Sequence, residues 1–322
     1  MMADTIEHSV IIPVHNEVGV IETLLDDVCE VMGALVKPFE ILVIDDGSTD
    51  ETWGVLKAAA QAHPEIVAHR LNRNFGQQAA ICAGLVLARG RGIGIMDGDG
   101  QDPPDVLKQL FERWQGGCDV AYAVRRNRQE GALKRTCYRA FYRVLSAMAE
   151  VPVPLDAGDF SVIDRDVARF ITTINDRTPF VRGLRSWYGG RQAAVEYDRR
   201  ERQGGKTKYS WLKLIDLAIN GITSLSKLPL RGAIYAGGMI SLLSFCYATF
   251  VVLRRIFIGF PQDWAWSVVV TLVAFLGGLN LLLVGFVGEY IAHIFDASKQ
   301  FPLYLIREST AAKTPSHERQ SP

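Results

Sequence analysis

The chain has 322 residues, and its 35 basic and 35 acidic residues leave no formal net charge at pH 7. This balance argues against a protein that binds nucleic acid through a strongly basic face. The 5 cysteines are scattered and form no C-x-x-C pair, which disfavours a disulfide framework or a zinc site and favours a reducing compartment. Residues 1–10 are polar and lack the features of a signal peptide.

Short apolar runs alternate with segments of helical periodicity from residue 9 to residue 124. This alternation predicts an α/β fold built on a doubly wound, mostly parallel sheet. Ser48 and Glu51 have the spacing of a capping box for the second helix. The expected strands are 9–14, 40–45, 66–70, 93–96 and 119–124, and the expected helices are 18–35, 51–62, 77–88 and 104–114.

A carboxylate-rich turn follows the strand expected at 93–96. Asp97 and Asp99 are separated by one glycine, and Gln101 and Asp102 come next. Carboxylate and amide oxygens suit Mg2+ or Mn2+, which often bind through one or two carboxylates and the phosphates of a substrate. The same residues also suit the plain roles of ending a strand and capping the next helix.

Asp45 and Asp46 end the strand expected at 40–45 in the same way. Ligands of doubly wound sheets bind at the carboxyl ends of the strands, so we expect these carboxylates to share one edge with those of the later turn. A dinucleotide-binding domain is not favoured, because Pro13-Val-His-Asn-Glu17 follows the first strand where G-x-G-x-x-G is needed.

The second half of the chain is less regular. We expect an amphipathic helix at 133–149, a loop at 155–160 before a strand, and a flexible basic loop at 199–209. Residues 209–231 predict helices that lie on a membrane surface. The polar tail after about residue 308 is expected to be disordered.

Two long uncharged stretches, 232–253 and 265–288, predict a pair of transmembrane helices. Basic residues are more frequent in the flanks than in the turn between the stretches, which places the large domain in the cytoplasm. The predicted organisation is a catalytic domain at 1–208, juxtamembrane helices at 209–231, a two-span anchor at 232–295 and a cytoplasmic tail at 296–322.

Five short motifs follow one another along the chain. They are Ile12-Pro13-Val14-x-Asn16-Glu17, Val43-Ile-Asp45-Asp46-Gly-Ser-Thr-Asp50, Asn72-Arg-Asn74-Phe-Gly76, Asp97-x-Asp99-x-Gln101-Asp-Pro-Pro104 and Arg202-x-x-Gly205-x-Thr207-Lys208-Tyr209. Together they resemble those of the family 2 GT-A glycosyltransferases. More narrowly, the chain is similar to the polyprenyl-phosphate glycosyltransferases, which include dolichyl-phosphate mannose synthase, bacterial bactoprenol glucosyl transferases and the undecaprenyl-phosphate aminoarabinose transferase. The resemblance runs from about residue 9 to residue 306.

The resemblance implies a site for a nucleotide sugar, a divalent metal and an acceptor. Asp97, Asp99 and Gln101 would hold Mg2+ or Mn2+ on the diphosphate, and Asp159 with Asp156 would lie near the acceptor. Asp99, Arg202 and Lys208 are also implied to be catalytic. The implied nucleotide-sugar site comprises Pro13, Val14, Asn16, Glu17, Asp45, Asp46, Asp97, Gly98, Arg125, Arg202 and Lys208.

The sequence departs from the family pattern at two positions. Many relatives have arginine where this chain has Ser161, so another cation, Arg125 or Arg126, would have to bind the acceptor phosphate. Gly98 stands where relatives often have alanine, which is expected to be a minor change.

The implied reaction is inverting transfer of a sugar from a nucleotide sugar to a polyprenyl phosphate. UDP-glucose and undecaprenyl phosphate are the first choices, and aminoarabinose, mannose and N-acetylglucosamine remain open as the sugar. The phosphate nucleophile is largely ionised at pH 7, which favours an orienting role for Asp159 over proton abstraction. The implied setting is the cytoplasmic face of the bacterial inner membrane, with a multi-pass, self-associating protein in contact with membrane lipid.

Two rival functions deserve comparison. A processive polysaccharide synthase is disfavoured, because Gln109 and the Arg113-Trp114 pair are one residue too far apart for Q-x-x-R-W. A non-catalytic membrane scaffold that has kept a nucleotide-binding domain stays open, although the intact carboxylates and the basic loop argue for catalysis.

Overall fold

A computed structural model of the chain describes residues 6–35, 37–126, 157–174, 179–199, 264–298 and 301–311, with separate positions between 239 and 257. The chain divides into two compact units, the first from residues 1–146, 151–208 and 301–322 and the second from 147–150 and 209–300. The elements are β1 (His8–Val14), α1 (Ile21–Gly33), β2 (Phe39–Asp45), α2 (Thr52–Ala62), β3 (Ile66–Leu71), α3 (Gln77–Leu87), β4 (Gly92–Ile95), α4 (Pro104–Gln115), β5 (Val120–Arg125), β6 (Ala157–Asp164), α6 (Arg165–Thr173), α7 (Val181–Tyr188), β7 (Gln192–Tyr197), α10 (Trp264–Ser298) and β8 (Ile306–Ser309).

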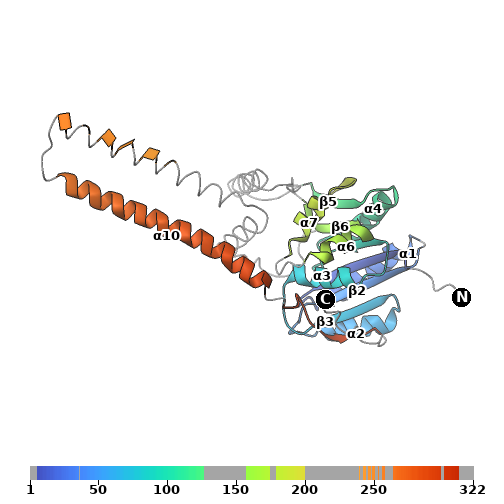
Figure 1. Ribbon diagram of the computed structural model, residues 1–322. Coiled ribbons are helices and arrows are strands. Elements are labelled where there is room, and N and C mark those ends of the chain that lie inside the picture. Colours follow the sequence, from blue (N-terminus) through green and yellow to red (C-terminus); the bar gives the residue numbers. More distant parts are fainter. Residues whose placement is uncertain are drawn as a thin grey trace. The chain divides into compact units, whose positions relative to one another are not determined.

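An eight-stranded sheet in the order β7-β5-β6-β4-β1-β2-β3-β8 forms the first unit (Figure 1). β1 pairs in parallel with β2 and β4, β2 with β3, and β5 with β7. β6 and β8 run antiparallel to their neighbours. The predicted α/β fold with a mostly parallel sheet is therefore confirmed.

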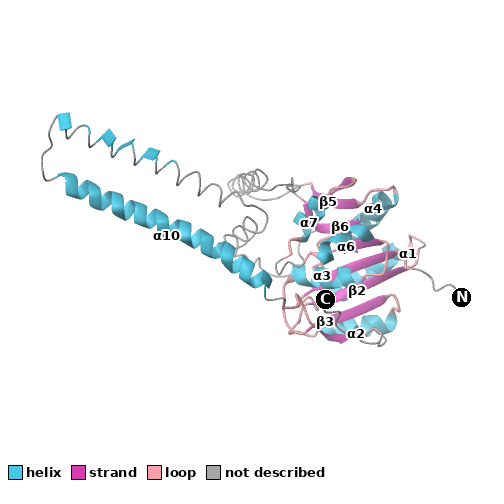
Figure 2. Cartoon of the chain, in the orientation of Figure 1, coloured by secondary structure: helices cyan, strands magenta, loops and turns pink. Residues whose placement is uncertain are grey.

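Helices cover both faces of this sheet (Figure 2). Successive side chains of a strand point to opposite faces, and β1 shows this, because Val10 and Ile12 belong to one core cluster and Ile11 to the other. α1, α2 and α4 pack on the first cluster. α3 and α6 pack on the second, which confirms the doubly wound arrangement.

The structure differs from the sequence prediction at the loop expected for residues 155–160. β6 begins at Ala157, so Gly158, Asp159 and Phe160 lie within a strand. Ser161 pairs with Ile95 of β4 on one side and with Tyr122 of β5 on the other. On the β5 side the pairing continues to Ala157, which lies opposite Val124, so the strand includes residues that have low intrinsic β propensity.

The capping box expected at Ser48 and Glu51 is also absent. α2 starts at Thr52, and its first turn has no side-chain cap from Glu51. The Ser48 hydroxyl instead accepts a hydrogen bond from the backbone N–H of Asn16 at 3.0 Å. Ser48 therefore links two loops at the carboxyl edge of the sheet.

β8 is an edge strand that the sequence prediction missed. The prediction placed residues 296–322 in a separate tail, whereas Ile306–Ser309 pairs antiparallel with β3. Thr310 extends the contact, because its backbone N–H donates to the carbonyl of Ala68 at 2.9 Å. The last described part of the chain thus covers the open edge of β3.

In the second unit, α10 spans the second of the two stretches predicted to cross a membrane. Only separate positions of the first stretch, 232–253, are described. Among the described residues, no helix combines the length and apolar character that a membrane crossing requires. The prediction of two transmembrane helices is therefore not supported. The helices expected at 133–149 and 209–231 lie outside the described residues.

Candidate active site

Three carboxylates gather between the end of β4 and the start of α4. Asp97 accepts a hydrogen bond from Nε2 of Gln77 at 2.7 Å, and Asp99 accepts one from the backbone N–H of Gln101 at 3.1 Å. Asp102 is buried and accepts a hydrogen bond from the hydroxyl of Tyr197 at 2.8 Å. α3, the turn itself and β7 therefore fix the three carboxylates.

Arg199 lies among these carboxylates, two residues beyond the end of β7. Its Nη2 is 3.4 Å from Oδ2 of Asp97 and 3.6 Å from Oδ2 of Asp99. Its Nε is 3.6 Å from Oδ1 of Asp102. The arrangement therefore accepts a positive charge at the point toward which the three carboxylates converge.

The electrostatics of the cluster favour a cation. Burial, followed by repulsion from Asp102, Asp159 and Asp99, raises the pKa of Asp97 to about 7. Burial is also the largest cause of a raised pKa at Asp102. A divalent cation held by these oxygens would favour the ionised carboxylates. The donor set therefore fits Mg2+ or Mn2+, with Asp97 and Asp99 as the residues that would hold it.

Asp159 on β6 lies close enough to Asp97 to raise the pKa of that carboxyl group. Its own carboxylate is buried and makes a two-point ion pair with Arg182 of α7. Gln78 of α3 donates to Oδ2 of Asp159 at 3.0 Å and accepts from the backbone N–H of Val181 at 3.1 Å. Asp159 is thus held in place by two helices.

Two further arginines lie in this region. The Arg185 side chain is buried, its Nη2 donates to the Gly158 carbonyl at 3.4 Å, and burial lowers its pKa to about 10. Arg125, at the end of β5, donates from Nε to the hydroxyl of Tyr197 at 3.3 Å. Because Tyr197 also binds Asp102, Arg125 is linked to the carboxylate cluster through one side chain.

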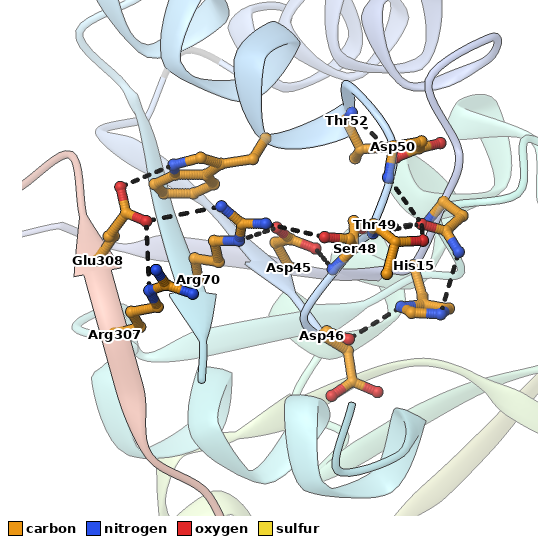
Figure 3. Close-up of polar contacts among 12 residues, drawn as sticks. His15, Asp45, Asp46, Ser48, Thr49, Asp50, Thr52, Arg70, Arg307 and Glu308 are labelled. Carbon is orange, nitrogen blue, oxygen red and sulfur yellow. Dashed lines mark hydrogen bonds and ion pairs between the residues drawn. The ribbon is translucent and has the colours of Figure 1, made fainter. Parts of the chain in front are cut away.

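A second group of polar contacts joins the ends of β1 and β2 (Figure 3). Asn16 adopts a φ of 58°, which is uncommon for a residue other than glycine. Its Oδ1 accepts a hydrogen bond from the backbone N–H of Thr49 at 2.8 Å, and the backbone N–H of Glu17 donates to the Thr52 hydroxyl at 3.1 Å. His15 contacts the carbonyl of Asp46 at 2.9 Å. Residues 46–52 after β2 therefore hold the loop after β1 in its conformation.

Asp45 and Asp46 are both buried in these loops. Asp46 accepts hydrogen bonds from the backbone N–H groups of Phe75 at 2.7 Å and Gly76 at 2.8 Å. Asp45 accepts one from the backbone N–H of Ser48 at 2.8 Å. Both carboxylates thus hold loop backbones in place, and a direct contact of either with a nucleoside stays a prediction.

The structure brings most of the predicted site residues to the carboxyl edge of the sheet. Pro13 and Val14 end β1, and Gly98 packs against both of them. Asp156, Arg202 and Lys208 lie outside the described residues, so their roles stay predictions.

Sequence reasoning missed four polar side chains of the site, of which two lie on α3, one on α7 and one just after β7. Gln77 and Gln78 follow the Asn-Phe-Gly loop directly, so their place at the start of a helix next to that loop was a usable signal. Arg182 had no motif around it, and Arg199 was expected only as the first residue of the basic loop at 199–209. The four are Gln77, Gln78, Arg182 and Arg199.

Comparisons with known proteins agree with this geometry. Residues 9–171 match the family model described as glycosyl transferase family 2. The chain is 38% identical over 309 residues to the uncharacterised glycosyltransferase YkcC of Bacillus subtilis, covering 96% of this chain and 95% of that protein. It is 39% identical over 305 residues to the uncharacterised glycosyltransferase sll0501 of Synechocystis, covering 94% and 96% respectively.

A relative with a more specific name shows the same extent of similarity. The bactoprenol glucosyl transferase of Shigella phage SfV is 36% identical over 300 residues, which cover 93% of this chain and 97% of that protein. The family model accounts for the part of the sheet that carries Asp97, Asp99, Asp102 and Asp159. The chain belongs to glycosyl transferase family 2 and is a glycosyltransferase.

Proposed function

We propose that this enzyme transfers glucose from UDP-glucose to undecaprenyl phosphate, with inversion at the anomeric carbon, on a catalytic domain of the GT-A type. The cluster of Asp97, Asp99 and Asp102 around the guanidinium of Arg199 carries the proposal. Similarity to bactoprenol glucosyl transferases over nearly the whole chain supports the polyprenyl phosphate acceptor and the sugar.

The leaving group of the reaction is a nucleoside diphosphate, on which negative charge grows as the sugar departs. Mg2+ or Mn2+ bound by Asp97 and Asp99, with Gln101 nearby, would supply positive charge that stabilises this leaving group. Arg202 and Lys208 are proposed to bind the same phosphates from the segment that follows β7. Arg199 would be free to turn toward the diphosphate once a metal has taken over its place among the carboxylates.

The acceptor phosphate needs little activation. The second pKa of a phosphate monoester is about 6, so the nucleophile is largely ionised at pH 7. Asp159 is already engaged by Arg182 and Gln78, which supports an orienting role over proton abstraction. A single displacement with the two substrates held in line needs no covalent enzyme intermediate and inverts the anomeric centre.

The nucleoside is proposed to bind beside the end of β1, on Pro13, Val14, Asn16 and Glu17. The hydrogen bonds that hold Asn16 at its unusual φ support this, because backbone strain at a loop is often found at binding sites. Asp45 and Asp46 would act mainly by shaping the loops around the nucleoside.

The acceptor is a lipid, so we propose that the enzyme works at the cytoplasmic face of the bacterial inner membrane, where it associates with lipid and with further copies of itself. Exposed apolar side chains on α10, such as Trp266, Phe275 and Leu281, support contact with lipid. Large exposed apolar surfaces commonly mark membrane or protein contacts.

The proposal is tested by transfer of label from a panel of UDP- and GDP-sugars to undecaprenyl phosphate, with Mn2+ or Mg2+ added. We expect a glycolipid product from UDP-glucose that Asp99→Asn abolishes. Asp166→Asn, a matched change at an exposed ion pair on α6, should retain the activity. A product from another donor would replace glucose as the sugar assigned to the reaction. No product from any donor, with UDP binding retained, would overturn the proposal in favour of a scaffold.

A further inference from the structure

Glu308 on the edge strand β8 contacts two side chains of the sheet unit. Its Oε2 accepts a hydrogen bond from Nε1 of Trp53 at 3.1 Å, and its Oε1 is 3.6 Å from Nη1 of Arg70 (Figure 3). Nε of Arg307 lies 3.8 Å from the same Oε1 of Glu308. A residue from the far end of the sequence therefore touches α2 and β3 at the carboxyl edge of the sheet.

Arg70 connects this strand to the loop that follows β2. Its Nη2 donates to the Ser48 carbonyl at 2.8 Å, and its Nε is 3.4 Å from Oδ2 of Asp45. The guanidinium also lies over the ring of Trp53, 5.8 Å from the centroid. One planar cation thus contacts the Asp45 carboxylate, the Ser48 backbone and Glu308 at the same time, and its position depends on all three.

The Asp45 carboxylate needs this cation. Asp45 is fully buried, and its Oδ2 has no hydrogen-bond partner. Its Oδ1 accepts from the backbone N–H of Ser48 at 2.8 Å, and the Ser48 hydroxyl accepts from the backbone N–H of Asn16 at 3.0 Å. Displacement of the guanidinium would therefore change the position of Asp45, then of the Ser48 loop, and then of the loop that carries Asn16.

We propose that Glu308 is a positioning residue for the nucleoside part of the donor site, acting through Arg70 on the Ser48 loop. This inference rests on the proposed function for the identity of the donor. The C-terminal strand then contributes to donor binding without touching the donor.

The expected effect is modest, because Glu308 and Arg70 are only partly buried, with side-chain exposures of 42% and 23%. Partly exposed ion pairs contribute up to about 1 kcal/mol, which corresponds to a change in affinity of about fivefold or less. Binding of the donor should weaken and binding of the acceptor should not change, because the contacts of Glu308 connect it to the loops after β1 and β2 and not to Asp159.

The test compares Glu308→Gln with the wild-type full chain. Glutamine can still accept from Trp53 but lacks the charge that attracts Arg70. We expect the Kd for UDP and the KM for the donor to rise about two- to fivefold, with kcat and the KM for the acceptor unchanged. Backbone amides of residues 45–50 should exchange hydrogen faster. Arg70→Lys, which keeps the charge but loses the planar fork, should show the same pattern.

Glu7→Gln is the matched control, since Glu7 makes a similar surface pair with Arg91 at 3.7 Å before the start of β1. It should change none of these quantities. Unchanged donor affinity and unchanged exchange at 45–50 in both test variants would overturn the inference. Wild-type protein that binds UDP but transfers no sugar would overturn the proposed function, and the UDP affinities would still decide the role of Glu308.

Discussion

Arg182 binds Asp159 through two hydrogen bonds, from Nε to Oδ1 at 2.9 Å and from Nη2 to Oδ2 at 3.0 Å. Gln78 donates to the same Oδ2 at 3.0 Å. Both oxygens of this buried carboxylate are therefore engaged by side chains from α7 and α3. Paired donors of this kind fix the orientation of a carboxylate.

Asp159→Asn should separate an orienting role from a role as general base. We expect kcat to fall by roughly 10- to 100-fold, because the amide cannot accept from Arg182 and Gln78 in the same geometry and the aligned substrates shift. The acid limb of the pH profile of kcat should keep its position. The measurement is the rate of glycolipid formation between pH 5 and pH 8 in both proteins.

The control for this change is Asp166→Asn, which alters an exposed aspartate paired with Arg169 at 3.3 Å. It should leave kcat unchanged. A loss of activity above about 1000-fold at Asp159→Asn, together with disappearance of the acid limb, would instead identify Asp159 as the base.

Arg199→Gln should strengthen metal binding in the absence of nucleotide. In the wild-type protein a metal must displace the guanidinium from Asp97, Asp99 and Asp102. Without that cation, the carboxylates should bind Mn2+ about tenfold more tightly, a difference of about 1.4 kcal/mol. Electron paramagnetic resonance of free Mn2+ measures the affinity directly and does not depend on turnover.

An exposed arginine provides the comparison for this prediction. Arg169→Gln removes the same charge from α6, where the arginine pairs with Asp166, and should leave Mn2+ affinity as in the wild-type protein. Equal or weaker Mn2+ binding by Arg199→Gln would mean that Arg199 supports the metal site and does not compete for it.

The regular part of the fold was predictable because its signals are local. The strands at β1 to β5 were read from short apolar runs, and Pro104 at the first turn of α4 marked a helix start. The start of β6 was not visible in local signals, because Gly158 and Asp159 are poor strand formers and lie in the strand between Ala157 and Ser161, which both pair with β5. β8 was missed because its four residues include Arg307 and Glu308 and gain their order from β3.

The site was predictable to the same extent. Asp97, Asp99 and Gln101 follow one strand at short spacing, and this pattern carried the prediction, whereas the place of Asp102 in the carboxylate cluster was not predicted. Arg199 reaches these carboxylates from 102 positions after Asp97, and Arg182 reaches Asp159 from 23 positions away, so tertiary structure alone brings the two arginines into the site. Asp45 and Asp46 were recognised as important, but their burial under loop backbones was not visible in the sequence.

Two buried histidines should make the stability of the sheet unit depend on pH. Burial lowers the pKa values of His8 and His69 below the ordinary value of 6.5. The unfolded chain therefore binds protons that the native state does not bind. Their contribution is fully present above about pH 6.5 and is lost as the pH falls toward the native pKa values, with a limiting slope of about 1.4 kcal/mol per pH unit for each histidine.

Thermal unfolding between pH 7.5 and pH 5 checks this prediction. The midpoint should fall across this range in the wild-type protein, and His69→Leu should reduce the slope, because it removes one of the two groups. A His69→Leu slope equal to that of the wild-type protein would mean that other groups cause the pH dependence.

Gly98→Ala should be costly in this chain, although alanine at this position looked like a minor change from the sequence. A Cβ atom at residue 98 would lie 2.5 Å from Cγ1 of Val14 and 2.8 Å from the carbonyl oxygen of Pro13. Neither atom belongs to the free end of a flexible side chain, so the end of β1 or the turn between Asp97 and Asp99 has to move. We expect a loss of about 1–3 kcal/mol in the free energy of unfolding and a higher KM for the donor.

Gly54→Ala is the matched change for this prediction, because residue 54 lies inside α2 and a Cβ atom there would meet only Oε2 of Glu51 at 3.3 Å. Alanine should stabilise that helix by up to about 1 kcal/mol. Denaturant unfolding gives the free energy of unfolding of both variants, and the KM for the donor shows whether the change reaches the donor site. If Gly98→Ala were as stable as wild type with an unchanged donor KM, the end of β1 would yield easily to the added methyl group. The close packing of Gly98 on Pro13 and Val14 would then have no part in shaping the donor site.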